Sequence, residues 1–231
     1  SGAAKKTLLT AEKGKGMVVQ GAMVRAGGRA VYELTITNQS PAPMQGFAIQ
    51  FNKNLMGMTN AEALSVPPLP PQQSHSTALV MAYSPEKLGP AAQPGLLQVA
   101  LKNTVGVCYF QDTVSLVPFL SEQGQIESAQ YPAMWQAIPP SNQAVAALTG
   151  FTLDVSYVEG RLRSGNVHVL HRKKLQSGGD ALYCSAKTES KVVVLCEVQV
   201  LAASARCAAR SQVAGIAQML PPAIQALLAP S

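Results

Sequence analysis

The stretch Ala30-Val31-Tyr32-Glu33-Leu34-Thr35-Ile36-Thr37 carries the clearest structural signal in this chain. Apolar and polar side chains alternate along it, and it is rich in β-branched and aromatic residues, which is typical of a strand with one buried face. The polar segment Asn38-Gln39-Ser40-Pro41 ends the pattern. The run therefore predicts a β-strand, and the segments on either side of it indicate what kind of sheet it joins.

Similar short runs continue along the first half of the chain, at residues 46–51, 76–83, 96–101 and 106–117. Between them, Pro67-Pro68-Leu69-Pro70-Pro71 must be a loop, because proline cannot pair inside a sheet. Six or seven short strands over ~110 residues are typical of an antiparallel, immunoglobulin-like β-sandwich. We assign this subdomain to residues 17–122. The polar, lysine-containing residues 1–16 are predicted to be a linker.

The pattern changes near residue 122, where the polar segment 121–125 is predicted to be a hinge. Helical signals are expected at residues 128–138 and 211–228, the second with Ser211 as N-cap and an interruption at Pro221-Pro222. Between these helices lie strand-like runs, at residues 144–157, 166–170, 181–186 and 191–201. Helices mixed with an antiparallel meander predict a second, α+β subdomain at residues 123–231.

The composition excludes several classes of protein. Of the 231 residues, 47% are hydrophobic and only 13% charged, with 18 Lys+Arg against 12 Asp+Glu and a formal net charge of +6. A disordered chain would be poorer in apolar residues and richer in charge, and collagen or a long coiled coil would be far more biased. No apolar run approaches the ~20 residues that span a bilayer, so we expect a soluble protein.

The cysteine and histidine spacings give no sign of a metal site. No two cysteines have C-x-x-C spacing, and we expect buried free thiols at Cys108, Cys184, Cys196 and Cys207. His168 and His171 are three residues apart on a strand-like segment, which predicts rings on opposite faces and a solvent-exposed position. We therefore expect neither a metal nor a cofactor.

Motifs of catalysis are absent, and the strongest charge feature is the basic run formed by Arg161, Arg163, Arg172, Lys173 and Lys174. Such charges suit nucleic acid when stacking aromatics accompany them, but aromatic residues make up only 5% of the chain. A solvated loop is the plainer interpretation, and an acidic peptide or anionic membrane surface is a third. A nucleic-acid-binding module stays the main alternative function. A hydrolase is less favoured, because no nucleophile–base pair is recognisable.

The single tryptophan, Trp135, precedes Ile138-Pro139 on the short predicted helix. A lone tryptophan is most often a core residue. Tryptophan is also the leading hot-spot residue at peptide-binding surfaces, since it offers a large rigid area and an N–H donor. Both interpretations are open from the residue alone.

Several sequence blocks resemble the appendage, or ear, domain of the large β subunit (β-adaptin) of clathrin adaptor complexes. They include Gly46-Phe47-Ala48-Ile49-Gln50-Phe51-Asn52-Lys53-Asn54 and Leu97-Gln98-Val99-Ala100-Leu101-Lys102-Asn103, together with Val107-Cys108-Tyr109-Phe110, Trp135 with Ile138-Pro139, Asp180-x-Leu182-Tyr183 and Leu195-x-Glu197. The blocks occur in the family's order over residues 17–220. The resemblance implies an immunoglobulin-like sandwich followed by a platform, an antiparallel sheet flanked by helices. It implies a non-catalytic protein.

The resemblance also implies two peptide-binding sites. The platform site is expected around Trp135, Tyr183 and Glu197, with Lys173 of the basic run beside it. Two positions there depart from the animal members, Gln136 where a basic residue is usual and Gln143 where an acid is expected, and both changes remove charge from the rim. The sandwich site is expected at Tyr109, with Gln98, Ala100 and Lys102 on one face of the neighbouring strand.

The partners that the resemblance implies are short Phe-containing motifs of disordered endocytic and trafficking accessory proteins, and clathrin. Other adaptor subunits would be joined through the trunk of the β subunit. The expected location is cytoplasmic and peripheral, on clathrin-coated membranes of the plasma membrane, trans-Golgi network or endosome. No nucleic acid and no transmembrane segment are expected.

Overall fold

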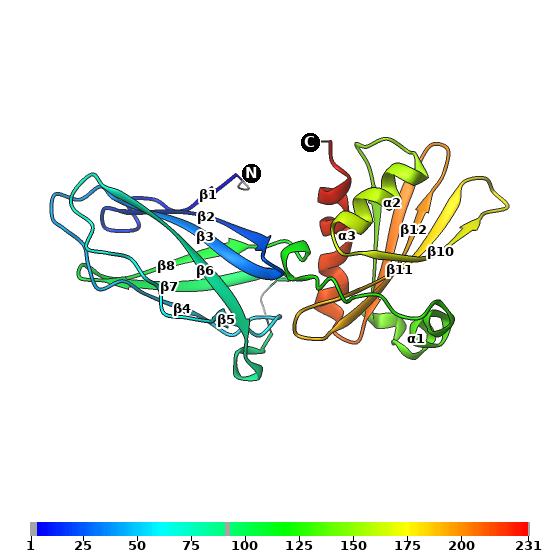
Figure 1. The fold of residues 1–231 in the computed structure, drawn as a ribbon, viewed down its shortest axis with the longest axis horizontal. Helices are drawn as coiled ribbons and strands as arrows, with labels where there is room; N and C mark the ends of the chain where they lie inside the picture. The colour runs from blue at the N-terminus through cyan, green and yellow to red at the C-terminus, as the bar shows by residue number, and fades with distance from the viewer. Residues whose placement is uncertain (1–3, 91–92, 231) are drawn as a thin grey trace. The chain divides into compact units, whose positions relative to one another are not determined.

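The computed structural model describes residues 4–90 and 93–230. They form two compact units that divide between Val114 and Ser115 (Figure 1). The first is built of β-strands with one short 3₁₀ turn, Pro85–Lys87, and the second combines a sheet with three α-helices. This confirms the predicted fold class, an antiparallel sandwich followed by an α+β subdomain.

The first unit consists of two antiparallel sheets, one of five strands in the order β1-β2-β3-β6-β5 and one of three in the order β4-β7-β8. Their bounds are β1 Lys6–Leu9, β2 Met17–Ala26, β3 Arg29–Asn38, β4 Ala48–Phe51, β5 Met58–Asn60, β6 Ser74–Tyr83, β7 Leu96–Asn103 and β8 Gly106–Thr113. Residues 30–37, which have the clearest strand pattern in the sequence, lie in β3. This strand is at the centre of the larger sheet, where one of its faces packs on the core.

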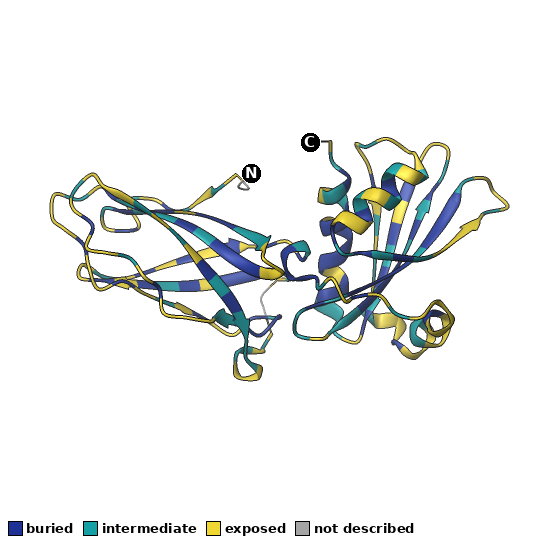
Figure 2. Ribbon diagram, viewed as in Figure 1, coloured by how far each residue is buried: buried dark blue, intermediate teal, exposed yellow. Residues whose placement is uncertain are grey.

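The core of this unit lies between the two sheets, where alternate residues of each strand are buried (Figure 2). Tyr32 of β3 packs against Phe51 of β4, with 6.2 Å between the ring centroids. The Tyr32 hydroxyl donates a 2.7 Å hydrogen bond to Asp112 of β8. One side chain therefore ties the larger sheet to both outer strands of the smaller one.

The predicted linker at residues 1–16 is wrong for its described part. Residues 6–9 form β1, which pairs with β2 in register Lys6 to Gly21, and Leu9 is buried. Lys6 also forms an ion pair with Asp112. The prediction failed because β1 is only four residues long, which is too short to show a clear alternation. The strand is stabilised by its pairing with β2.

The second unit is built on one antiparallel sheet in the order β10-β11-β12-β13-β9. The strands are β9 Gln143–Leu148, β10 His168–Lys174, β11 Asp180–Lys187, β12 Val193–Val200 and β13 Ala205–Ser211, and the helices are α1 Tyr131–Ala137, α2 Val155–Ser164 and α3 Ala214–Leu228. Short 3₁₀ turns occur at Val117–Phe119, Ser128–Gln130 and Pro140–Asn142. Helix α3 packs on β9 and β13, and α2 packs on α3 and β10. Helix α1 covers part of the opposite face (Figure 1).

The division between the units comes eight residues earlier than the predicted boundary between residues 122 and 123. Phe119 and Leu120 are fully buried, and Leu120 forms a bridge with Thr188 of the second unit. The boundary was predicted from the polar segment 121–125, but the two apolar residues before this segment are already part of the second unit.

Three elements of the second unit differ from prediction. The run 144–157 is not one strand but β9 followed by α2, whose N-cap Asp154 accepts a hydrogen bond from the Tyr157 amide. Strand β13 had no prediction, and Ser211 belongs to it instead of capping the final helix. Helix α3 continues through Pro221 and Pro222 without a break.

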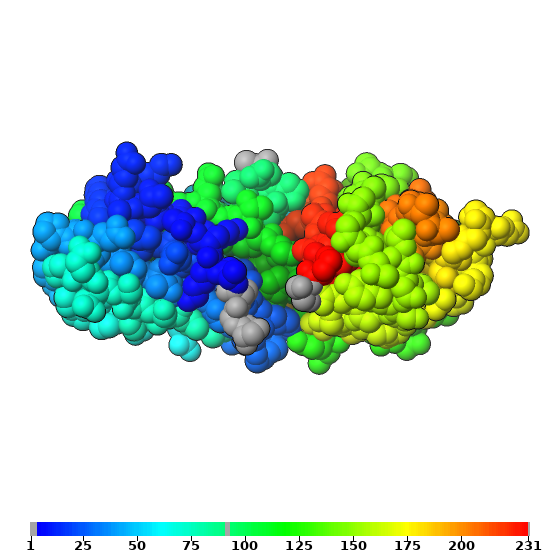
Figure 3. All heavy atoms as spheres, turned by 90° about the horizontal axis from the view of Figure 1, so that it is seen from above, coloured from blue at the N-terminus to red at the C-terminus, as the bar shows by residue number. Residues whose placement is uncertain are grey.

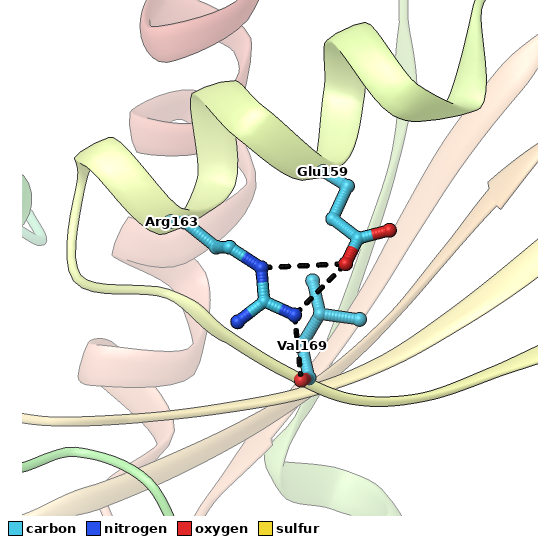
Figure 4. A network of polar contacts seen from close by, with 3 residues as sticks. All are labelled: Glu159, Arg163 and Val169. Carbon is cyan, nitrogen blue, oxygen red and sulfur yellow. Dashed lines mark hydrogen bonds and ion pairs between the residues drawn. The ribbon is translucent and has the colours of Figure 1, made fainter.

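Helix α2 is fastened at its C-terminal end by Arg163. Its guanidinium donates to the Glu159 carboxylate at 2.8 Å and to the Val169 carbonyl of β10 at 3.4 Å (Figure 4). Two residues earlier, Arg161 donates to the Leu227 and Ala229 carbonyls, which have no partner within the helix at the end of α3. These arginines hold α2 between the sheet and the last helix.

All four cysteines are buried and free, as predicted. Hydrogen bonding with the Cys184 thiol, together with burial, raises the pKa of Cys196 well above its ordinary value. The Cys196 thiol therefore stays protonated in the core. Within residues 4–90 and 93–230, no helix has the length and apolar character needed to cross a membrane.

Candidate functional site

Helix α1 is positioned by prolines at both ends. Pro132 occupies its first turn, where the missing amide hydrogen is not needed. Pro139 forces the preceding Ile138 into an extended conformation, which ends the helix at Ala137. Tyr131 and Ile138 are buried against Leu195 of β12. The helix is therefore fixed on the sheet, and Trp135, one turn after Tyr131, lies beside that contact.

A cavity of about 400 Å³ opens next to Trp135, between α1 and the strands β10, β11 and β12. We call it the Trp135 cavity. Its wall is largely aromatic: Tyr131 and Trp135 stack at 5.6 Å, and Tyr183 meets Tyr131 edge to face at 5.5 Å. The lining residues are Ser128, Tyr131, Pro132, Trp135, Gln136, Leu170, His171, Lys173, Tyr183 and Glu197. Such a surface suits an aromatic or aliphatic side chain.

The electrostatics of the cavity depend on one acid and one lysine. Glu197 is the single carboxylate among the described residues that line it, and the Gln199 amide donates a hydrogen bond to that carboxylate. Burial, with a smaller effect of Glu197, raises the pKa of Tyr183, and burial strongly raises that of Tyr131. Both phenols therefore stay protonated. Lys173 supplies a cation at the opposite wall.

Five of the six residues expected at the platform site line this cavity: Trp135, Gln136, Lys173, Tyr183 and Glu197. The sixth, Gln143, lies outside it at the start of β9, where its side-chain oxygen accepts a 2.7 Å hydrogen bond from Arg210. That arginine was not anticipated. Its guanidinium carbon lies 4.6 Å from the centroid of the Trp135 ring, and it donates to the Trp135 carbonyl at 3.0 Å.

The β10 strand brings Leu170 and His171 to the cavity, and it contains a bulge at this point. The register slips between Val169 and His171, so that His168 pairs with Ser185 and His171 with Tyr183. These partners are two residues apart, which puts both histidines on one face, contrary to prediction. His171 stacks on Tyr183 at 6.2 Å. Among the described residues, no group of three or more His, Cys, Asp or Glu side chains could hold a metal.

The basic run is largely compensated within the chain. Besides Arg161 and Arg163, Arg172 and Lys174 both bind Asp180, at 2.8 and 3.0 Å. The Arg172 and Lys174 hydrogen bonds lower the pKa of the Asp180 carboxyl. These contacts lie beside the turn that closes the β10–β11 hairpin, and the tip of this hairpin projects from the unit (Figure 3, yellow).

The expected sandwich residues lie on the exposed face of the sheet β4-β7-β8, which we call the Tyr109 surface. Gln98, Ala100 and Lys102 point outward along β7, and Ala100 pairs directly with Tyr109. The Tyr109 side chain is 75% exposed. It borders a cavity of about 560 Å³ lined by Leu8, Leu9, Lys13, Asn52, Gln98, Val99, Ala100, Tyr109, Phe110 and Gln111. Lys102 does not line this cavity.

Leu8, Leu9 and Lys13 come from the segment predicted to be a linker. Sequence reasoning missed them because β1 was not recognised. The Trp135 cavity had one usable signal for a missed residue: Tyr131 precedes Trp135 by four, which places both on one helix face. Nothing local to Arg210 indicated its contact with Trp135.

Comparison with known proteins identifies relatives over most of the chain. Residues 121–228 match the family model described as beta2-adaptin appendage, C-terminal sub-domain. The chain is 31% identical over 208 residues to AP-1 complex subunit beta-1 of Homo sapiens, covering 89% of this chain and 22% of that protein. The rat protein of the same name is 32% identical over 201 residues (86% and 21%). AP-1 complex subunit beta of Dictyostelium discoideum is 28% identical over 193 residues (81% and 20%). The chain thus spans about a fifth of the length of these relatives.

Proposed function

The chain belongs to the β-adaptin appendage family, and from this premise we propose that it is a non-catalytic peptide-binding module of a clathrin adaptor β subunit. It recruits accessory proteins, and clathrin, through short Phe-containing motifs during vesicle-mediated protein transport. Its place of action is the cytoplasmic side of coated membranes. The remaining adaptor subunits contact parts of the β subunit outside this chain.

The observation that carries the proposal is the Trp135 cavity. An aromatic wall on a rigid short helix, next to an open sheet face, offers a ligand phenylalanine a large buried area at low entropic cost. Glu197 and Lys173 at its walls can orient polar groups of the same ligand. We propose Trp135, Tyr183, Glu197, Gln136 and Lys173 as binding residues. Gln143 does not touch the ligand but positions Arg210, which lies over the Trp135 ring.

The Tyr109 surface supports a second contact for extended acidic motifs. Its exposed tyrosine would stack on a ligand side chain, while Lys102 and Lys13 attract carboxylates. Single motifs should bind with Kd near the micromolar level, about −8 kcal/mol. Partners that repeat the motif gain avidity from a high effective concentration.

The nucleic-acid alternative loses its support, because Arg161, Arg163, Arg172 and Lys174 bind groups within the chain. A salt titration with RNA tests it directly. Binding driven by phosphate contacts would fall steeply between ~50 and ~200 mM salt. We expect no RNA binding at either concentration.

The experiment that tests the proposal is calorimetry with two synthetic peptides. One is helical, about four turns long, with a single phenylalanine; the other is extended and acidic, also with one phenylalanine. Trp135→Ala should weaken the helical peptide about thirtyfold or more, ~2 kcal/mol, and spare the extended one. Tyr109→Ala should do the reverse. Leu153→Ala, which trims a 37% exposed apolar side chain that lines neither cavity, is the control.

Since Trp135 packs beside Tyr131, its removal could also disturb the fold. Ser128→Trp avoids this, because it fills the Trp135 cavity from an exposed position without removing core contacts. It should block the helical peptide while the melting temperature stays unchanged. If helical-peptide binding survives Ser128→Trp, the cavity is not the binding site and the proposal fails.

A further inference from the structure

The turn between β7 and β8 lies at one end of the sandwich (Figure 1) and exposes two apolar side chains there. Val105 in the turn and Val107 at the start of β8 are each 40% exposed. The buried Asn103 side chain accepts a 2.7 Å hydrogen bond from the Val105 amide. The Thr104 amide donates to the Gln45 carbonyl at 2.9 Å. The backbone of the turn is therefore fixed, and it keeps Val105 at the surface.

Three lysines lie at the same end of the sandwich. Lys102, near the end of β7, pairs with Val107 across the hairpin. The Lys15 ammonium lies against the turn, since a Cβ added to Gly106 would be 3.2 Å from its Nζ. Lys13 is exposed in the same loop as Lys15. Among the residues that the structure describes, none of these three lysines forms a salt bridge, so their charges are available to a partner.

This end of the sandwich is also poor in acids. Strand pairing brings three loops to it, because the end of β3 pairs with the starts of β2 and β6, and the end of β7 pairs with the start of β4. The loops are residues 10–16, 39–47 and 69–73. Together with residues 102–107 of the hairpin, they contain the three lysines and a single carboxylate, Glu12. The exposed valines therefore lie in a region of net positive charge.

The region is distinct from the Tyr109 cavity, which neither valine, nor Lys15, nor Lys102 lines. An exposed apolar turn among unpaired cations matches a negatively charged bilayer in two ways. The aliphatic side chains can enter the boundary between headgroups and acyl chains. The lysines can keep their ammonium groups at the level of the lipid anions. An acidic peptide needs the lysines alone, whereas a bilayer uses the lysines and the valines together.

We propose that the Val105 tip, defined as Val105, Val107, Lys15 and Lys102, docks on an anionic lipid bilayer. The inference goes beyond the proposed function, which names only proteins as ligands. Because two small side chains insert little area, the contact is weak for one chain and adds to other attachments of a larger assembly. The fixed backbone of the turn lowers the entropy that is lost on docking.

The test is co-sedimentation of the whole chain with vesicles of phosphatidylcholine, either alone or with about 30% phosphatidylserine. The wild type should bind the anionic vesicles about tenfold more than the neutral ones. Lys15→Gln and Val105→Ser should each lower this binding about fivefold. The matched controls, Lys53→Gln and Leu88→Ser, change an exposed lysine and a 56% exposed leucine at the other end of the sandwich. They should leave vesicle binding within about twofold.

Two results overturn the inference: no preference of the wild type for anionic vesicles, or equal losses in the control variants. Calorimetry with the extended acidic peptide supplies another check, since Val105→Ser should leave its Kd unchanged. If Val105→Ser weakens that peptide and not vesicle binding, the tip belongs to a peptide site and the inference fails. The effects of Trp135→Ala and Ser128→Trp on the helical peptide are measured separately, so the proposed function stands or falls independently.

Discussion

The Asp112 carboxylate is buried in the sandwich core and forms an ion pair with Lys6. Its side chain is 1% exposed, while that of Lys6 is 54% exposed. The Tyr32 hydroxyl donates to one carboxylate oxygen, and Lys6 pairs with the other. We predict that Lys6→Met, which keeps the apolar stem and removes the cation, destabilises the first unit although it alters a partly exposed side chain.

The magnitude follows from the unequal burial of the two partners. Removing one member of a fully buried ion pair costs about 3–5 kcal/mol, and an exposed pair contributes about 0–1 kcal/mol. Tyr32 still satisfies one oxygen, and Lys6 also loses its 2.9 Å hydrogen bond to the Thr113 carbonyl. We therefore expect a loss near 2 kcal/mol. For a unit of this size that lowers Tm by roughly 8–16 °C.

The assay is urea unfolding of the whole chain, with Lys5→Met as the matched control. Lys5 is the adjacent residue and binds only the Thr35 hydroxyl among the described residues, so its replacement should cost less than about 0.5 kcal/mol. A double-mutant cycle with Asp112→Asn checks the cause. The neutral amide no longer needs a cation, so the double variant should lose less than the sum of the single losses. Equal losses for Lys5→Met and Lys6→Met, or strict additivity in the cycle, would refute the reasoning.

Two further predictions concern the β10–β11 hairpin. Gly178 and Gly179 both have positive φ, but an added Cβ meets nothing at Gly178 and overlaps the Val200 carbonyl oxygen at Gly179. In thermal melts Gly178→Ala should therefore cost about 1 kcal/mol and Gly179→Ala clearly more, and equal costs would contradict the geometry. Hydrogen bonds from Arg172 and Lys174 lower the pKa of Asp180, so its stabilising effect is present above the ordinary Asp pKa of ~4 and is lost as pH falls through the lowered value. Asp180→Asn should flatten this acid-side loss in urea midpoints measured across pH; an unchanged slope would contradict it.

The parts of the fold that sequence predicted are those in which burial follows a local period. The alternation of β3 and β7 was correct because one face of each strand packs on the core and the other faces solvent. The same period put Gln98, Ala100 and Lys102 on one exposed face. Helix α1 was predictable for a different reason, since prolines restrict the backbone at both its ends.

The missed elements depend on contacts between segments far apart in the chain. Strand β13 lies between β12 and β9, so it is stabilised by pairing on both sides rather than by its own pattern. The bulge in β10 changed the face of His171, which a strict period of two cannot express. Helix α2 could have been recognised from its N-cap, Asp154. It was missed because the strand-like residues before Asp154 were extended through it into one predicted strand.

The site shows the same division. The residue type of Trp135 left a core and a binding role open, and the family resemblance led to the expectation of a binding site there. Tyr131 could have been found from helical spacing. Arg210 is 75 residues from Trp135 in sequence, and only the sheet order brings β13 next to β9 and the end of α1. A sequence motif cannot reveal a residue that contacts the site from a strand distant in sequence.

The net charge of +6 takes on a different meaning once the ion pairs are known. In the basic run, Arg161 donates to a carbonyl at the end of α3, and Arg163 pairs with Glu159. Arg172 and Lys174 both pair with Asp180. Lys173, which has no such acid partner among the described residues, lines the aromatic cavity, and Arg210 lies over the Trp135 ring. Under the proposed function, cations left without an internal carboxylate at this cavity act on the bound peptide and not on the fold.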